Sequence, residues 1–102
     1  MQVTFTPQAK TDLLEIALYI AQDNQERALQ FTDALESHCY KLGDMPKIGT
    51  LREELGNGIR MMPHGRYLIF YRTIETHVQI VRILHSAMDI SADDFAGNDT
   101  RQ

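Results

Sequence analysis

The chain has 102 residues, a length that supports one hydrophobic core and excludes a multidomain enzyme. Hydrophobic residues make up 43% and charged residues 24% of the sequence, which is the composition of a folded globular domain. Ten Lys and Arg against 14 Asp and Glu give a net charge of -4, so unaided binding to nucleic acid is disfavoured. We therefore expect one domain over residues 1–102, with a compact core at about 2–89 and a tail at 90–102.

The single cysteine, Cys39, cannot form an internal disulfide, and no apolar run has the length of a membrane-spanning helix or the position of a signal segment. The cytoplasm is the expected compartment, with no membrane association. The four histidines, His38, His64, His77 and His85, lack the close spacing of metal ligands. Generic nucleotide-binding and hydrolase motifs are absent as well, so we expect no metal and no other cofactor.

The first segment, Gln2–Phe5, alternates polar and apolar residues and predicts a short strand. Thr6 followed by Pro7 is a helix start, and the helix is expected to run to about Gln22. Three polar residues, Lys10, Asp12 and Glu15, are expected to lie off its buried face. That face consists of Ala9, Leu13, Ile16, Ala17 and Ile20.

The same helix carries a second apolar stripe, formed by Leu14, Leu18 and Ala21. A helix with a single buried face does not need it. We interpret these three residues as a surface for a protein partner, which would lay an amphipathic helix across them or in the adjoining groove, with an added strand at the sheet edge as a further contact.

Asp23 and Asn24 interrupt the helical pattern, and either can cap a second helix, since Asp23 and Glu26 have the spacing of a capping box. Gly43 is the expected left-handed stop of this helix. The turn-rich segment 44–58 is expected to be a loop, or at most a helical turn. The predicted buried face is Ala28, Phe31, Leu35, Cys39 and Leu42, which assigns Cys39 to the core.

Three strands are expected at Ile59–Met62, Arg66–Thr73 and Val78–His85, joined closely enough to form an antiparallel meander. The segment Tyr67–Tyr71 is apolar on both sides of the pleat, as in a central strand covered on two faces. The helices cover one face. The tail at Ile90–Phe95, or another chain, must cover the second.

Positive charge is concentrated in residues 46–82, a segment that contains six basic residues and three acidic ones. Strand alternation places Arg82 with Val78, Ile80 and Leu84, and places His85 on the opposite face. An RNA-cleaving site that combined Arg82 and His85 would need a bulge between them, and no glycine is present there.

The order of these elements and the amino-acid sequences of the strands resemble the ParE branch of the RelE/ParE toxin superfamily, the plasmid stabilisation family. Residues 3–89 carry the resemblance. Its segments are Ala9-x-x-Asp12-Leu13-x-x-Ile16-x-x-Tyr19-Ile20-Ala21-x-Asp23-Asn24, Met45-Pro46-x-x-Gly49, Arg60-x-x-Pro63-x-Gly65-Arg66-Tyr67-Leu68-Ile69-Phe70-Tyr71-Arg72 and Ile80-Val81-Arg82-Ile83-Leu84-His85-x-Ala87-x-Asp89.

The resemblance implies an α+β fold with an N-terminal strand, a two-helix hairpin and a three-stranded antiparallel meander, the helices packing on one face of the sheet. It also implies a growth-inhibiting toxin of a type II toxin-antitoxin system, bound and neutralised by a ParD-like antitoxin. ParE-like toxins are associated with stabilising the cleaved complex of DNA gyrase with DNA, whereas RelE-like relatives cleave mRNA on the ribosome.

The net acidity and the separation of Arg82 from His85 favour a gyrase inhibitor that has no catalytic residues and acts by binding. Arg60, Arg66 and Arg82 are the candidate target-binding residues. The alternatives are a ribosome-dependent endoribonuclease, using these arginines with His85 or a tyrosine, and an inactive module that only binds its antitoxin.

The tail begins with Ser91-Ala92-Asp93-Asp94, which resembles a helix start capped by Ser91. Ile90 and Phe95 are its apolar anchors. We expect a short docked helix followed by disorder from about Gly97.

Overall fold

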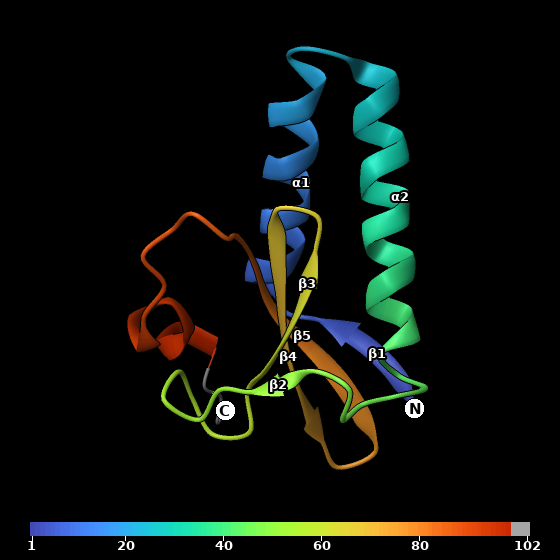
Figure 1. The fold of residues 1–102 in the computed structure, drawn as a ribbon. Coiled ribbons are helices and arrows are strands. Elements are labelled where there is room, and N and C mark those ends of the chain that lie inside the picture. Colours follow the sequence, from blue (N-terminus) through green and yellow to red (C-terminus); the bar gives the residue numbers. More distant parts are fainter. Residues whose placement is uncertain (99–102) are drawn as a thin grey trace.

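The computed structural model describes residues 1–98 and contains two helices, a five-stranded sheet and a C-terminal 3-10 helix (Figure 1). The strand order is β1-β5-β4-β3-β2, in which β1 pairs with β5 in parallel and all other neighbours are antiparallel. The predicted α+β fold is therefore confirmed. The strands are β1 (Gln2–Phe5), β2 (Thr50–Leu51), β3 (Arg60–His64), β4 (Tyr67–Ile74) and β5 (His77–His85).

The two helices are α1 (Pro7–Ala21) and α2 (Gln25–Lys41), and each begins at a capping side chain. The hydroxyl of Thr6 accepts a hydrogen bond from the Ala9 N–H at 3.0 Å. The Asn24 side chain accepts one from the Arg27 N–H, also at 3.0 Å. Asn24, and not Asp23, is thus the cap of α2.

Gly43 does not have the left-handed conformation that was expected at the end of α2, since the glycines with positive φ in residues 1–98 are Gly58 and Gly65. Its lack of a side chain serves close packing instead, because a Cβ atom there would collide with the Met1 carbonyl. The Met1 ammonium donates to the Gly43 carbonyl at 2.9 Å. This contact joins the end of α2 to the start of β1.

The three predicted strands of the meander are present, with ends shifted by one or two residues. The turn between β3 and β4 depends on Gly65, whose φ of 59° favours glycine. The segment expected to be a loop contains the short strand β2, in which Thr50 and Leu51 pair with β3. Two residues are too few for a recognisable alternating pattern, so the sequence could not reveal this strand.

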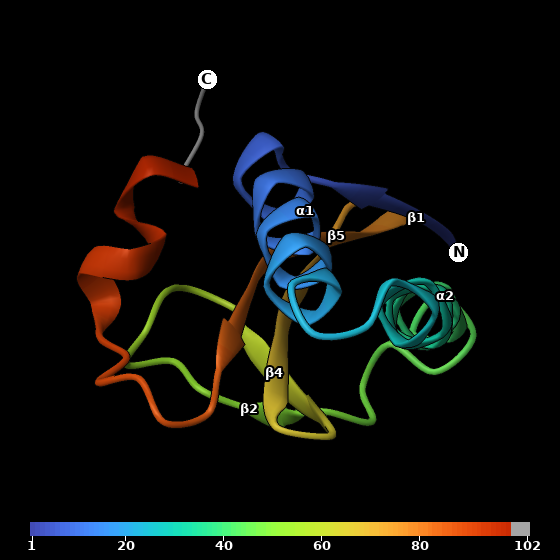
Figure 2. The same ribbon diagram turned by 90° about the horizontal axis from the view of Figure 1, so that it is seen from above.

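Both helices pack on one face of the sheet (Figure 2). Cys39 is fully buried there, and burial raises the pKa of its thiol to about 12, which confirms its role as a core residue. The buried residues of this core are Ala9, Ile16, Leu35, Cys39, Leu42, Ile69, Tyr71, Val78, Ile80 and Ile83.

A second core covers the other face of the sheet, as the apolar pattern of the central strand requires. The 3-10 helix η1 (Ala92–Asn98) places Phe95 against Phe70, with ring centroids 5.0 Å apart. The tail of the chain itself therefore covers this face. Disorder was expected from about Gly97, but Gly97 and Asn98 belong to η1, and residues 99–102 lie outside the described part of the chain. The buried members of this core are Leu55, Ile59, Phe70, Val81, Leu84 and Phe95.

A β-bulge in β5 changes which residues share a face. Phe70 pairs with Arg82 and Tyr71 pairs with Ile80, so Val81 has no partner across the ladder. Ile80 belongs to the core beneath the helices, whereas Val81 and Leu84 belong to the second core. The prediction that Arg82 shares a face of the strand with Val78 and Ile80 is therefore wrong, because a bulge forms here without a glycine. After the bulge the strand is regular, so Arg82 and His85 still point to opposite faces.

Two histidines link α2 to the end of β3. The Nδ1 atoms of His38 and His64 lie 2.8 Å apart, a hydrogen bond in which one ring donates and the other accepts. The His64 ring also packs edge-on against Phe31 of α2. Burial lowers the pKa of both imidazoles from 6.5, and Lys41 lowers that of His38 further.

This pair predicts acid sensitivity. The neutral rings contribute stability in full above pH 6.5, and the contribution is lost as the pH falls through their lower folded-state pKa values, because the unfolded chain then binds more protons. Urea unfolding across this pH range should show a smaller acid-induced loss of stability for His64→Asn than for the wild type. The control is His77→Asn. An unchanged pH profile for His64→Asn would contradict the prediction.

Candidate functional site: partner-binding surfaces

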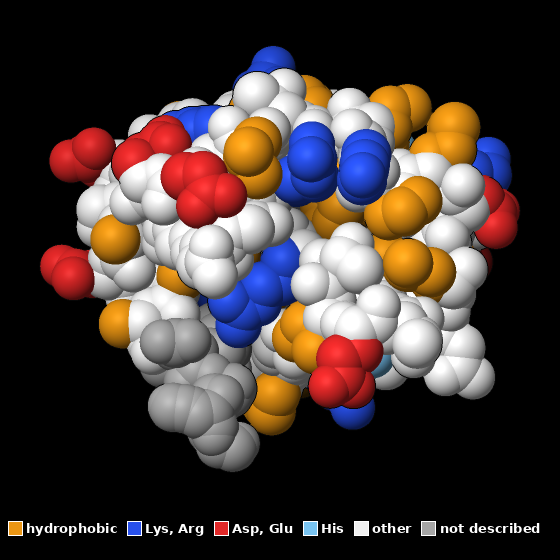
Figure 3. All heavy atoms as spheres, turned by 90° about the horizontal axis from the view of Figure 1, so that it is seen from below, with side chains coloured by type: hydrophobic (Ala, Val, Ile, Leu, Met, Phe, Trp, Pro, Cys, Tyr) orange, Lys and Arg blue, Asp and Glu red, His pale blue; other side chains and the backbone are white. Residues whose placement is uncertain are grey.

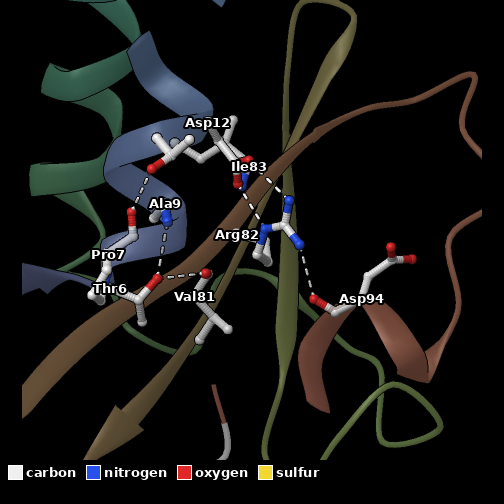
Figure 4. Close-up of polar contacts among 9 residues, drawn as sticks. Thr6, Pro7, Ala9, Asp12, Val81, Arg82, Ile83 and Asp94 are labelled. Atoms are coloured by element: carbon white, nitrogen blue, oxygen red, sulfur yellow. Dashed lines mark hydrogen bonds and ion pairs between the residues drawn. The ribbon is translucent and has the colours of Figure 1, made fainter. Parts of the chain in front are cut away.

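Asp12 is buried and binds the last strand, although its place on the helical wheel predicted an exposed residue. Arg82 Nε and Nη2 donate to its two carboxylate oxygens at 2.9 Å each, in a bidentate pair. The Ile83 N–H donates to the same carboxylate, also at 2.9 Å (Figure 4). The prediction was wrong because it considered the buried face of α1 only, and Asp12 points to the edge of β5 beside that face.

All three side-chain nitrogens of Arg82 donate hydrogen bonds within the protein. Its remaining nitrogen, Nη1, donates to the Asp94 carbonyl of η1 at 3.0 Å (Figure 4). The hydrogen-bonded Asp12 carboxylate raises the pKa of Arg82, so the guanidinium is charged at neutral pH. Arg82 therefore joins α1, β5 and η1 and uses three of its five N–H groups to do so.

Arg60 also forms hydrogen bonds within the protein. Its Nη1 donates to the carbonyls of Gly49 and Lys47 at 2.9 and 3.3 Å. The Gly49 N–H donates to the Tyr71 hydroxyl at 2.8 Å, and burial is the main reason that the pKa of Tyr71 is raised. Arg60 and Tyr71 thus hold the loop before β2 against the sheet.

Arg66 is exposed in the turn between β3 and β4, and its side chain forms no hydrogen bond or ion pair within residues 1–98. It lines a hollow of about 560 Å³ together with Arg27 of α2, Tyr19 of α1 and His85 of β5. Arg66 therefore shares a hollow with Arg27, and neither Arg60 nor Arg82 lines it. Sequence reasoning missed Arg27 and Tyr19, because the packing of the hairpin on the sheet places them there.

His85 packs its ring edge-on against Tyr67, with centroids 5.1 Å apart. The Ala87 N–H donates to its Nδ1 at 3.0 Å, so the neutral ring carries its proton on Nε2. Arg82 and His85 both border a second hollow of about 290 Å³ beside Tyr19. The two residues approach one hollow from alternate faces of β5.

The apolar stripe on α1 is exposed, as its surplus over the buried face suggested. Leu14 and Leu18 are 59% and 58% exposed, and Ala21 is half-buried in the last turn. No element of residues 1–98 covers the two leucines. Their role in antitoxin binding stays a prediction.

The surface at the end of the molecule that carries the turn between β4 and β5 is rich in charged side chains, unlike the apolar stripe of α1. Lys and Arg side chains gather over the middle of this face, with acidic side chains toward its margins (Figure 3). A smaller hollow of about 140 Å³ nearby is lined by residues that include Leu55, Arg72 and Phe95. Within residues 1–98, no three His, Cys, Asp or Glu side chains could hold a metal ion, and no helix is long and apolar enough to cross a bilayer.

Comparison with known proteins identifies the family. The model of the ParE toxin of the type II toxin-antitoxin system, parDE, matches residues 3–90. Toxin ParE1 of Mycobacterium tuberculosis is 32% identical over 66 residues, which are 64% of this chain and 67% of that toxin. The chain therefore belongs to the ParE toxin family and is the toxin of a type II toxin-antitoxin system.

Solved structures agree in fold. A chromosomal ParDE system from P. aeruginosa matches with a TM-score of 0.72 at 23% identity, covering 83% of this chain and 95% of that one. The RelBE2 toxin-antitoxin complex from Mycobacterium tuberculosis matches with a TM-score of 0.61 at 28% identity, covering 82% and 95%. Both neighbours come from toxin-antitoxin systems.

The pair of Asp12 with Arg82 yields a stability prediction. Asp12→Asn leaves the Arg82 charge without its counter-ion, and should lower the free energy of unfolding by about 3 kcal/mol in urea titrations. Asp33→Asn, the same change at an exposed position of α2, should stay within about 0.5 kcal/mol of the wild type. Equal stability of the two variants would show that the pair contributes little.

Proposed function

We propose that this toxin inhibits DNA gyrase by binding it and stabilising its cleaved complex with DNA, and that a ParD-like antitoxin neutralises it in the cytoplasm. The observation that carries the proposal is the engagement of Arg82. All three of its side-chain nitrogens donate within the protein, to Asp12 and to the Asp94 carbonyl. An RNA-cleaving site built on this arginine would have only two of its five N–H groups left for a phosphate, which weakens its phosphate clamp.

The charge of the protein supports the same mechanism. A net charge of -4 disfavours the long-range attraction that draws a protein to RNA or to the ribosome. A toxin that occupies one conformational state of its target needs no turnover, because binding alone shifts the population of that state. On this proposal the toxin is not an enzyme.

The main alternative is a ribosome-dependent endoribonuclease. It is favoured by the hollow of about 290 Å³ that both Arg82 and His85 border. The neutral imidazole of His85 could donate a hydrogen bond from Nε2 there, whereas proton donation needs the imidazolium, which would lose the bond from the Ala87 N–H. Arg82 would contact RNA through the two N–H groups that its bonds to Asp12 and Asp94 leave unused. An inactive module that only binds its antitoxin is the third possibility.

Purified toxin should make gyrase accumulate cleaved plasmid in a supercoiling assay with ATP, and should leave mRNA intact on translating ribosomes. Arg66→Gln should reduce the cleaved product, since Arg66 is the one candidate target-binding arginine whose side chain forms no hydrogen bond or ion pair within residues 1–98. Lys10→Gln removes an exposed charge of α1 and serves as the control. Codon-positioned mRNA cuts with normal gyrase activity would overturn the proposal in favour of the endoribonuclease. No effect in either assay would favour the inactive module.

The antitoxin is expected to lay an amphipathic helix on Leu14, Leu18 and Ala21. Leu14→Asp combined with Leu18→Asp places two carboxylates on this stripe and should weaken antitoxin binding by about tenfold or more, as measured by calorimetry. The matched control is Ile48→Asp with Leu51→Asp, which changes two exposed apolar residues far from α1 in the sequence. Unchanged affinity of the first double variant, with its fold retained by circular dichroism, would place the antitoxin elsewhere.

A further inference from the structure

Two histidines that lie 26 positions apart in the chain meet in the folded protein. His38 belongs to the last turn of α2, and His64 is the last residue of β3. Their Nδ1 atoms are 2.8 Å apart, and both side chains are half-buried, so solvent reaches the pair. Two histidines this far apart form no metal-binding motif, which is why the sequence did not predict a site here.

The distance between the two Nδ1 atoms suits a chelated metal ion. Two nitrogen ligands at right angles, with bonds of about 2.0–2.1 Å, lie about 2.9 Å apart, whereas tetrahedral ligands lie about 3.4 Å apart. The observed 2.8 Å matches the right-angled arrangement. Square-planar and tetragonal sites with nitrogen and oxygen ligands are typical of Ni²⁺ and Cu²⁺. Rotation about the side-chain bonds is needed to direct both lone pairs at one ion.

The protonation state of the pair is also suitable. Burial lowers the pKa of both imidazoles, so both rings are neutral at neutral pH, as metal ligands must be. One of the two Nδ1 atoms carries the proton of their hydrogen bond. When an ion binds, this ring changes to the Nε2–H tautomer through solvent. Both Nδ1 atoms then become ligands, and no net proton is released.

The surroundings of the pair hold the rings in place. The His64 ring packs edge-on against Phe31, with centroids 5.5 Å apart, and lies 5.1 Å from the ring of His38. His38 lies near the carboxyl end of α2, where the helix dipole favours a cation. Lys41 in the same turn opposes this effect with its own positive charge. Within residues 1–98 no third His, Cys, Asp or Glu joins the pair, so water would complete the coordination.

We propose that His38 and His64 form a binding site for a divalent transition metal ion of the Ni²⁺ or Cu²⁺ type. The ion takes the place of the shared proton between the two Nδ1 atoms and joins α2 to the end of β3. The unfolded chain lacks the site, because its two histidines are 26 residues apart, so binding stabilises the folded protein. Binding also fixes the start of the turn that carries Arg66, since His64 directly precedes that turn.

Equilibrium dialysis of the untagged 102-residue protein against CuCl₂ at neutral pH tests the proposal. The wild type should bind Cu²⁺ at this site, and its electron paramagnetic resonance spectrum should show two nitrogen ligands. His38→Asn and His64→Asn should each weaken this binding about tenfold or more, because a single imidazole remains. His77→Asn removes a histidine outside the pair and should leave both the affinity and the spectrum unchanged.

Lys41→Gln gives a test of opposite sign. Loss of the positive charge beside His38 should tighten Cu²⁺ binding about twofold or more, whereas Lys47→Gln, at an exposed position outside α2, should leave it unchanged. In urea unfolding, Cu²⁺ should stabilise the wild type and should not stabilise His64→Asn. Equal Cu²⁺ affinity of the wild type and the two histidine variants, with their folds retained by circular dichroism, would overturn the proposal. A wild-type spectrum with a single nitrogen ligand would overturn it as well.

Discussion

The bidentate pair of Asp12 with Arg82 is the contact on which the arrangement of this molecule depends. β1 pairs with β5 only as far as Phe5 and Ile80, so the edge of β5 beyond that point has no neighbouring strand. The Thr6 hydroxyl donates to the Val81 carbonyl, and Asp12 accepts from the Ile83 N–H, so side chains satisfy the backbone groups of this edge. The bulge at Val81 turns Arg82 toward Asp12 and η1. One ion pair thus links the two cores of the protein.

Most of the fold could be predicted because its signals are local. The cap at Thr6, the apolar spacing of both helices and the two-sided apolar pattern of β4 each act within one element. The errors occurred where distant segments decide the structure. Gly43 is required by the carbonyl of Met1, β2 exists because β3 lies beside it, and the bulge at Val81 depends on the sheet and tail around it.

The site was less predictable than the fold for the same reason. The sequence identified Arg60, Arg66 and Arg82 as equivalent cations, and only their partners distinguish them. Two of them donate to groups within the protein, whereas Arg66 lines the hollow of about 560 Å³ beside α1. Tyr19 and Arg27 carry no motif, and the packing of the helical hairpin brings them beside β4 and β5. The exposed stripe of α1 could be predicted, since exposure follows from helical periodicity alone.

The pairing of the first strand with the last also determines when the protein becomes complete during its synthesis. β1 lies parallel to β5, and Thr6 bonds to a carbonyl 75 residues further along the chain. The helical hairpin forms from residues close in sequence, while the sheet must wait until β5 has left the ribosome. The outer surface of α1 is consequently available on the nascent chain before the finished toxin exists. The finished toxin therefore appears only after the whole sheet has been synthesised.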